Sequence, residues 1–452
     1  MSDTIAAVST GFQVSAIGIV RLSGEKAIEY ADRLFVPESG RPLSSAEDRK
    51  LIYGKLYSRD GTLLDICLCT VSRAPSSYTG ENTAEFQCHG SPVVLRTLLD
   101  ELFALGARQA LPGEFTKRAF INGKLELTSA EAVADIIESD SRESLRNAAG
   151  QLSGAIASKV DGIYSSLADI SSHYHAVLDY PDEDIEPFTL SRYESVISDG
   201  IKTLETLLST FSRGKLMASG IPAVIVGKPN VGKSSLLNAL LGYDRAIVTS
   251  VPGTTRDTIE EKLLLGGVTL RLTDTAGIHS TDDTVEELGV ERSLRAVKAS
   301  VLVIAVVDGS CPPDSEDMEI IRSAEKAEKG IVVVSKNDIS NAEYPVETTL
   351  PTLRISSVTG EGLDALEKAV CSLFPLPDVP AGEILTNSRH ADVAGRALEY
   401  LRSARDAMLS GATPDIVLTE TEGAMQAIGE LNGKTVREDI TNRIFARFCV
   451  GK

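Results

Sequence analysis

Short apolar runs separated by polar turns characterise the first hundred residues. Runs rich in β-branched and aromatic residues cover residues 17–22, 51–57, 64–71 and 83–88, and glycine, proline and serine separate them. One stretch with helical spacing of its apolar positions follows at residues 93–105. Runs of the first kind are typical of strands, and the period of the last stretch is typical of a helix. The pattern predicts an α+β unit.

The period changes to that of helices between residues 127 and 220. Apolar positions recur at intervals of three and four from Leu145 to Val177, which predicts one long amphipathic helix. An acidic loop bounded by prolines follows at residues 181–187. A second helical stretch covers residues 193–211, and we expect the two helices to pack as an antiparallel pair.

Apolar strands alternate with helical stretches from residue 222 to about residue 374. This alternation predicts a parallel sheet with helices on both faces. The expected strands are residues 223–226, 269–273, 301–307, 331–334 and 353–355.

The helical pattern resumes after a proline-rich linker at residues 375–380. This segment is too short to bury a substantial core by itself. We therefore expect it to complete the earlier helical unit. The predicted fold is therefore multidomain, with an α/β domain inserted into an all-α helical bundle domain. The expected boundaries are 1–120 for the α+β N-terminal domain, 121–215 and 379–452 for the two helical halves, and 216–378 for the inserted domain.

Composition and charge restrict the partners. The 452 residues include 64 acidic and 45 basic side chains, which gives a formal net charge of −19. A chain this acidic does not coat nucleic acid by bulk charge, so an RNA partner requires a local basic patch or a second protein. The longest dense apolar run, residues 301–307, is too short to span a membrane, and the N-terminus has no secretory pattern. These features predict a cytoplasmic protein.

The cysteines indicate a reducing environment. The six cysteines form no CxxC pair and have no zinc-type spacing, so we expect reduced thiols. Cys67 and Cys69 are two residues apart on a predicted strand, so their side chains point to the same face. We interpret that face as core rather than as the site of a redox pair.

A phosphate-binding loop directly follows the first strand of the α/β domain. Residues 227–234 read GKPNVGKS and precede a helix, which fits the pattern GxxxxGK[ST]. The backbone amides of such a loop and the start of the helix surround phosphates. Lys233 can reach the β and γ phosphates, and the Ser234 hydroxyl can bind Mg²⁺.

Further motifs follow in the order typical of GTP-binding domains. A DTAG sequence begins at Asp274, where it can hold Mg²⁺ through water and meet the γ phosphate, and Thr255 in GTTRD is a candidate second Mg²⁺ ligand. Asp338 can accept hydrogen bonds from guanine, while the stem of Lys336 covers the base. Adenine cannot donate in that pattern, so this motif selects GTP. The set resembles the translation-factor-related GTPases.

Three positions depart from the usual GTPase pattern. Ser335 stands where the base-binding motif NKxD has asparagine, and the lost amide contact is worth about 1 kcal/mol, so we expect GTP specificity with weaker affinity. Ser357 replaces the usual alanine beside Ser356, where a backbone amide can meet the guanine oxygen. Ile278 occupies the position of the glutamine that orients water in many GTPases, so another residue must orient it.

Over essentially its whole length the chain resembles the MnmE (TrmE) family of tRNA modification GTPases. The terminal CxGK is the most telling feature, because GTPases in general lack it. Besides the GTPase motifs, the matching stretches are DTI at 3–5, GIVRLSG at 18–24, YTGE at 78–81, EFQCHG at 85–90, PGEF at 112–115, FINGKLEL at 120–127, AEA at 130–132 and CVGK at 449–452.

The resemblance implies which groups take the place of the missing water-orienting glutamine and of an arginine finger. It implies that Glu286 orients the attacking water, although on the residues alone this side chain reads more simply as a solvated acid. It also implies that K⁺ replaces an arginine finger when two GTPase domains face each other. The implied K⁺ ligands are the Asn230 side chain and the carbonyls of Thr249, Val251 and Thr254. The motifs and the resemblance together predict a GTP site of Asn230, Val231, Gly232, Lys233, Ser234, Ser235, Thr249, Ser250, Val251, Pro252, Gly253, Thr254, Thr255, Asp274, Thr275, Ala276, Gly277, Ser335, Lys336, Asp338, Ser356 and Ser357.

The resemblance further implies a folate-binding N-terminal domain that also forms a homodimer. The implied ligand is 5-formyl- or 5,10-methylene-tetrahydrofolate, and Cys449 is either a reactive group at that site or an inert thiol. The implied reaction adds a carboxymethylaminomethyl or aminomethyl group to C5 of the wobble uridine of tRNA, in a heterotetramer with an FAD- and NADH-dependent protein of the MnmG type. The implied folate contacts are Arg21, Glu85, Lys124 and Lys452.

Two other functions stay open at this point. A regulatory switch GTPase of ribosome assembly or signalling shares the GTPase motifs but requires neither folate nor the terminal CxGK. A non-catalytic folate-binding scaffold is disfavoured by the intact phosphate loop. Folate binding by the full-length chain separates the first of these from the modification enzyme.

Overall fold

In a computed structural model, the chain forms two compact units, and each is described by itself. The first unit comprises Met1–Ala134, Gln151–Gly200 and Arg396–Lys452, and the second comprises Asp135–Gly150 and Ile201–Gly395. The structure describes residues 3–179, 190–242, 261–273, 296–339, 344–375, 378–435 and 438–452. The three-domain boundaries expected from the sequence stay a prediction.

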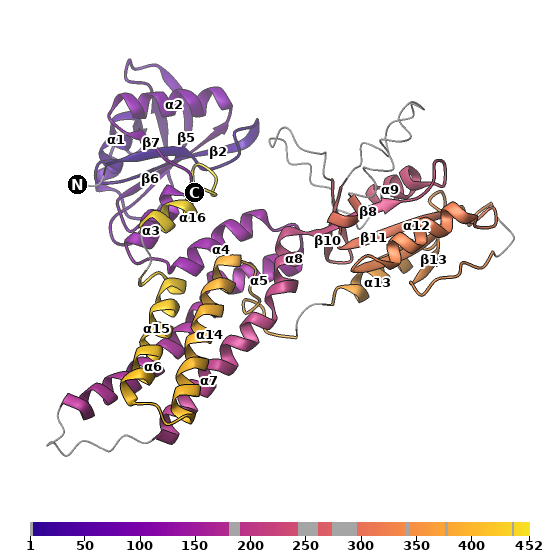
Figure 1. The fold of residues 1–452 in the computed structure, drawn as a ribbon. Coiled ribbons are helices and arrows are strands. Elements are labelled where there is room, and N and C mark those ends of the chain that lie inside the picture. The colour runs from indigo at the N-terminus through magenta and orange to yellow at the C-terminus, as the bar shows by residue number, and fades with distance from the viewer. Residues whose placement is uncertain are drawn as a thin grey trace. The chain divides into compact units, whose positions relative to one another are not determined.

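The first unit contains a seven-stranded sheet in the order β3-β4-β5-β6-β2-β1-β7 (Figure 1). The strand pairs are antiparallel apart from β1 with β7, which is parallel. The four predicted strands are confirmed, and the short strands β1, β3 and β7 are additions. The strands are β1 (Ile5–Val8), β2 (Ser15–Ser23), β3 (Phe35–Pro37), β4 (Ile52–Tyr57), β5 (Leu63–Ser72), β6 (Thr83–Gly90) and β7 (Arg108–Gln109).

Two helices, α1 (Ala27–Leu34) and α2 (Pro92–Ala104), cover one face of this sheet. Their apolar side chains form one core with the inward positions of the strands. Cys67 and Cys69 of β5 are both buried in that core, which confirms the interpretation of these cysteines as core residues.

Over the residues that belong to the first unit, the predicted helical pair is antiparallel, as expected, but its first member is shorter than predicted. The stripe from Leu145 to Val177 belongs to two helices, α5 (Arg142–Leu152) and α6 (Ala155–Asp179). Gly154, with φ +89°, breaks the expected single helix, because this left-handed backbone cannot continue it.

The second helix also ends earlier than expected. Helix α7 (Leu190–Ser209) ends before Thr210, and α8 (Phe211–Ser219) then begins. The Tyr193 hydroxyl of α7 donates to the Ile170 carbonyl of α6 at 2.5 Å. Gly200 of α7 approaches Ile163 of α6, so residue numbers rise in one helix as they fall in the other.

Helices from the last part of the chain join this bundle. Helix α15 (Pro414–Asn432) packs along α6, and Asn432 and the neighbouring Lys434 both donate to Asp161, at 2.6 and 2.8 Å. Tyr400 of α14 (Ser388–Leu409) packs against Gly423 of α15. Segments separated by more than 200 residues in the sequence thus pack together.

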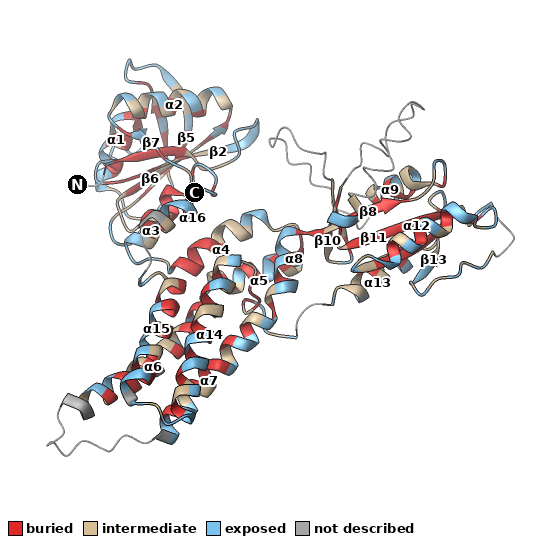
Figure 2. Ribbon diagram, viewed as in Figure 1, coloured by how far each residue is buried: buried red, intermediate tan, exposed pale blue. Residues whose placement is uncertain are grey.

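The second unit contains a six-stranded sheet in the order β13-β12-β11-β8-β10-β9. It is parallel apart from β9, as predicted for the strands that the sequence indicated. Buried side chains of α9 and α13 pack on one face, and those of α12 pack on the other. Figure 2 shows the central strands β8 and β11 as buried. The elements are β8 (Ile221–Val226), α9 (Lys233–Leu241), β9 (Glu261–Leu265), β10 (Val268–Leu272), β11 (Leu302–Asp308), α12 (Ser315–Glu325), β12 (Lys329–Ser335), β13 (Thr352–Arg354) and α13 (Leu363–Leu373).

No helix within the described ranges combines the length and the apolar character needed to cross a bilayer.

Candidate functional site

The phosphate loop lies between the end of β8 and the start of α9 in the second unit. Asn230 and Gly232 have φ of 63° and 103°, so the loop turns twice through the left-handed region before the helix begins. A Cβ at Gly227 would lie 2.4 Å from the Val306 carbonyl oxygen, so the loop passes against β11 where only glycine fits. The backbone is therefore curled as anion-binding loops require.

Lys233 is the first residue of α9 and its side chain turns back over the loop. Its ammonium donates to the carbonyls of Gly227 at 2.7 Å and Lys228 at 2.6 Å. Burial lowers the pKa of Lys233, because the charged form loses water. A phosphate at the mouth of the loop would form an ion pair with this ammonium.

The base-binding motif lies at the carboxyl end of β12, next to the phosphate loop. The buried Ser335 hydroxyl lies 2.5 Å from the Val231 carbonyl and 3.0 Å from the Val307 carbonyl. It therefore connects the phosphate loop to the sheet, a role that sequence reasoning missed.

Two further contacts order the motif. Lys336, with φ 60°, donates to Asp308 at 2.6 Å, and this aspartate was not a predicted site residue. The Ser356 hydroxyl donates to the exposed Asp338 carboxylate at 2.7 Å. The amide of Ser356 donates to the Glu361 carbonyl at 3.0 Å.

The structure describes the predicted site residues of the phosphate loop, which are Asn230, Val231, Gly232, Lys233, Ser234 and Ser235. Many other predicted site residues lie outside the described residues. Those outside are Thr249, Ser250, Val251, Pro252, Gly253, Thr254, Thr255, Asp274, Thr275, Ala276, Gly277 and Glu286.

The first unit contains the paired residues of the predicted folate site. Arg21 of β2 and Glu85 of β6 are directly opposite in the sheet register, and their side chains form an ion pair at 2.6 Å. The guanidinium lies 5.6 Å from the ring centroids of both Tyr78 and Phe115. A partly buried polar pair flanked by aromatic rings fits a flat, polar heterocycle such as a pterin.

The C-terminal tail is attached to the same region. The Lys452 carbonyl accepts from the amide of Phe115, the residue whose ring lies under Arg21. The carbonyl of Cys449 accepts from Gly113, while its side chain is exposed. The chain end that carries the CxGK sequence therefore lies close to the Arg21–Glu85 pair.

Lys124 is the predicted folate contact that the structure does not join to the others. It is exposed just after α3 (Glu114–Ile121), and no contact in the described residues joins it to Arg21 or Glu85. It lines an open pocket of about 490 Å³ together with Ser153 and Asp161.

A network of ion pairs, also missed by sequence reasoning, holds α3 against the N-terminal strand. Arg118 contacts Asp3, Glu81 and Glu114 at 2.7, 2.9 and 3.1 Å, and Arg108 contacts Asp3 and Glu114, both at 2.7 Å. Burial of Glu114 opposes its ionisation, but hydrogen bonds from Arg108, the Leu111 amide and Arg118 prevail and lower its pKa. Asp3, Glu81 and Glu114 lie in the stretches that carry the family resemblance. That was the one sign in the sequence that these residues belong to a network.

Comparisons with known proteins match the whole chain. Residues 4–124 match the family described as GTP-binding protein TrmE N-terminus, and residues 127–449 match the MnmE helical domain. The tRNA modification GTPase MnmE of Carboxydothermus hydrogenoformans is 40% identical over 461 residues, which are 100% of this chain and 100% of that protein. That of Roseiflexus castenholzii is 40% identical over 467 residues, 100% of this chain and 99% of that protein. Among solved structures, the G domain of the T. maritima FeoB iron transporter matches this chain at 28% sequence identity and a TM-score of 0.25. The match covers 34% of this chain and 97% of that chain.

Proposed function

This chain belongs to the MnmE (TrmE) family of tRNA modification GTPases, and we propose that it hydrolyses GTP in a K⁺-stimulated reaction coupled to wobble-uridine modification. The observation that carries the GTPase assignment is the phosphate loop, with Lys233 over its mouth and Ser335 connecting it to the base-binding motif. The same proposal assigns the protein to the cytoplasm, together with its tRNA substrate.

The nucleotide is held from two sides. Lys233 exchanges its two carbonyl contacts for the β and γ phosphates, and Ser234 binds Mg²⁺ together with Thr255. Asp338, oriented by Ser356, accepts from the guanine edge, and the amide of Ser357 faces the guanine oxygen.

Hydrolysis requires an oriented water and a positive charge beside the transferred phosphoryl group. Glu286 orients the water, because Ile278 cannot. Asn230 and the carbonyls of Thr249, Val251 and Thr254 would hold a K⁺ ion when the GTPase domains of a homodimer face each other, and this ion would supply the charge.

The N-terminal unit binds the one-carbon donor. Arg21 and Glu85 contact the heterocycle of a tetrahydrofolate derivative, and Lys452 and Lys124 contact its anionic tail. The attachment of the C-terminal tail to Phe115 supports the inclusion of Lys452. A partner of the MnmG type supplies FAD and NADH and most of the tRNA contact, which fits the net charge of −19.

Steady-state GTP hydrolysis in KCl and in NaCl, at matched ionic strength with Mg²⁺, tests the proposal. We expect at least tenfold stimulation by K⁺ alone, and Glu286→Ala should abolish turnover while GTP binding remains. Equal, slow rates of GTP hydrolysis in both salts would contradict activation by K⁺ between facing GTPase domains. If the full-length chain also failed to bind tetrahydrofolate, the regulatory switch would be the better assignment.

A further inference from the structure

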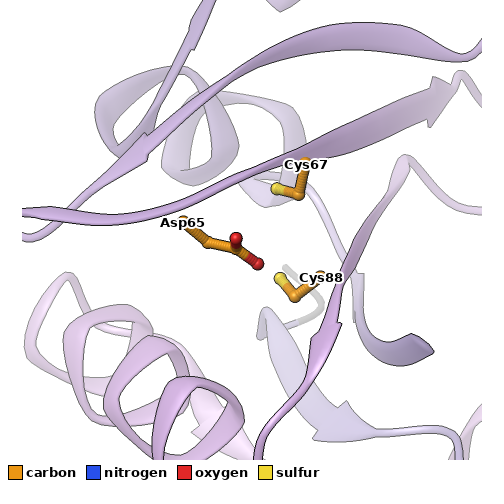
Figure 3. A group of neighbouring side chains, drawn as sticks. All are labelled: Asp65, Cys67 and Cys88. Atoms are coloured by element: carbon orange, nitrogen blue, oxygen red, sulfur yellow. The ribbon is translucent and has the colours of Figure 1, made fainter. Parts of the chain in front are cut away.

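Three side chains with metal-ligating atoms meet at one end of the first unit's sheet. Asp65 and Cys67 are two residues apart on β5, so both point to the same face. The register pairs Leu68 with Gln87, which places Cys67 opposite Cys88 of β6. The ligand atoms of the three side chains lie within 4.8 Å of one another. Figure 3 shows the side chains converging on one space.

The two thiols are buried, and the Asp65 side chain is largely shielded from solvent. Cys67 is 5% exposed, Cys88 is 1% exposed and the Asp65 side chain is 9% exposed. Within the described parts of the chain, the basic side chain paired with Asp65 is that of His89, which is charged only when protonated. A buried carboxylate costs free energy unless a cation or several hydrogen bonds compensate it. Hydrogen bonds from the Ile66 amide, the His89 amide and the His89 ring reach this carboxylate. A bound dication would add an ionic partner to them.

His89 holds the carboxylate in position for such an ion. Its Nδ1 lies 2.7 Å from Asp65 Oδ1, and its backbone amide donates to Asp65 Oδ2 at 2.9 Å. The imidazole itself is 76% exposed. Carboxylates that bind metals are usually held by such hydrogen bonds, and the exposure of His89 places the cluster next to solvent.

We propose that Asp65, Cys67 and Cys88 bind one thiophilic divalent cation of the Zn²⁺ class. Two thiolates and a carboxylate suit Zn²⁺, whereas hard ions such as Mg²⁺ prefer oxygen ligands. Tetrahedral ligand atoms lie about 3.5–3.8 Å apart, so side chains separated by as much as 4.8 Å would have to close by only about 1 Å. Water occupies the fourth position.

Binding at this site releases protons. Cys67 and Cys88 are free, buried cysteines, so the metal-free site holds thiols. Metal uptake breaks two S–H bonds, forms two metal–sulfur bonds and releases two protons to solvent.

Co²⁺ titration of the reduced, metal-free full-length protein tests the proposal. We expect one equivalent to produce thiolate-to-metal absorption in the near ultraviolet and tetrahedral bands in the visible, and Zn²⁺ to displace it. Co²⁺ at the Mg²⁺ position beside Ser234 has oxygen ligands and produces no thiolate band. Cys67→Ala and Cys88→Ala should abolish the band, and Asp65→Asn should weaken binding about tenfold.

Cys69→Ala is the matched control, because Cys69 lies on the same strand and face and is fully buried, but is outside the three-residue cluster. It should retain the band, and GTP hydrolysis should be unchanged in every variant. The proposal is overturned if the wild-type protein shows no thiolate band. It is equally overturned if the band survives Cys67→Ala and Cys88→Ala, or if Cys69→Ala loses it as completely.

Discussion

Ser335 has one hydroxyl hydrogen but two carbonyl oxygens within reach. The Val231 and Val307 carbonyls belong to the phosphate loop and to β11, so the hydroxyl can donate to only one of them at a time. An asparagine amide, with two hydrogens, can donate to both. Serine at this position therefore connects the two halves of the nucleotide site through fewer hydrogen bonds than asparagine could make.

Changes at Ser335 should alter GTP affinity in both directions. Ser335→Ala removes the remaining hydrogen bond and should weaken GTP binding about fivefold, which corresponds to about 1 kcal/mol. Ser335→Asn should strengthen binding by a similar factor. Equilibrium titration with a fluorescent GTP analogue measures both.

Ser357→Ala is the control for these variants, because only the backbone amide of Ser357 is assigned to the base. Its affinity should match that of the wild-type protein. Equal affinities for Ser335→Ala and the wild-type protein would contradict the role given to the hydroxyl.

At the scale of elements, the ion pairs around α3 make a pH-dependent contribution to stability. The folded-state pKa of Glu114 lies below its ordinary value of 4.5. The carboxylate therefore stabilises the fold above about pH 4.5, and this contribution is lost as the pH falls through the lowered pKa. Glu114→Gln should lower the free energy of unfolding by about 2 kcal/mol at pH 7, and the difference from the wild-type protein should narrow towards pH 3.

Thermal unfolding at both pH values measures this effect. Glu29→Gln is the matched control, because Glu29 pairs with Arg33 at 2.7 Å but both side chains are half exposed or more. Such surface pairs contribute little. A difference for Glu114→Gln that stays constant from pH 7 to pH 3 would contradict the ionic origin of the effect.

The elements also show where sequence reasoning succeeds. Strands with clear alternation and the motif-bearing loop were predicted at nearly their observed positions. The break between α5 and α6 was missed because Leu152 and Ile156 keep helical spacing across it, although Gly154 was a visible signal. Strand β9 was missed although Gly266-Gly267 separates two apolar runs, a pattern typical of a hairpin.

The candidate sites divide in the same way. The phosphate loop is contiguous, so its residues could be read directly from the sequence. The cluster of Asp65, Cys67 and Cys88 could not, because it depends on the register of two strands, and the 21-residue separation of the cysteines matches no local metal motif. Nonlocal pairing is what a single sequence does not contain.

At the scale of the whole molecule, the two ends of the chain meet in the first unit. Gly451, with φ +97°, lies so close to β1 that an added Cβ would be 2.1 Å from the Val8 carbonyl oxygen. The Ser9 hydroxyl donates to the Gly451 carbonyl at 2.9 Å, and Val450 forms a bridge with Pro112. Glycine is therefore required in the terminal CxGK sequence for the tail to reach Phe115.

Gly451→Ala should detach this tail. We expect faster digestion by carboxypeptidase and at least tenfold weaker tetrahydrofolate binding, whereas GTP affinity should not change because the phosphate loop belongs to the other unit. Gly411→Ala is the control, because Gly411 also has a positive φ, of 72°, but no heavy atom lies within 4 Å of an added Cβ. It carries the backbone strain without the collision. If both variants bound folate equally well, close packing of the tail would not be what places Lys452 at the folate site.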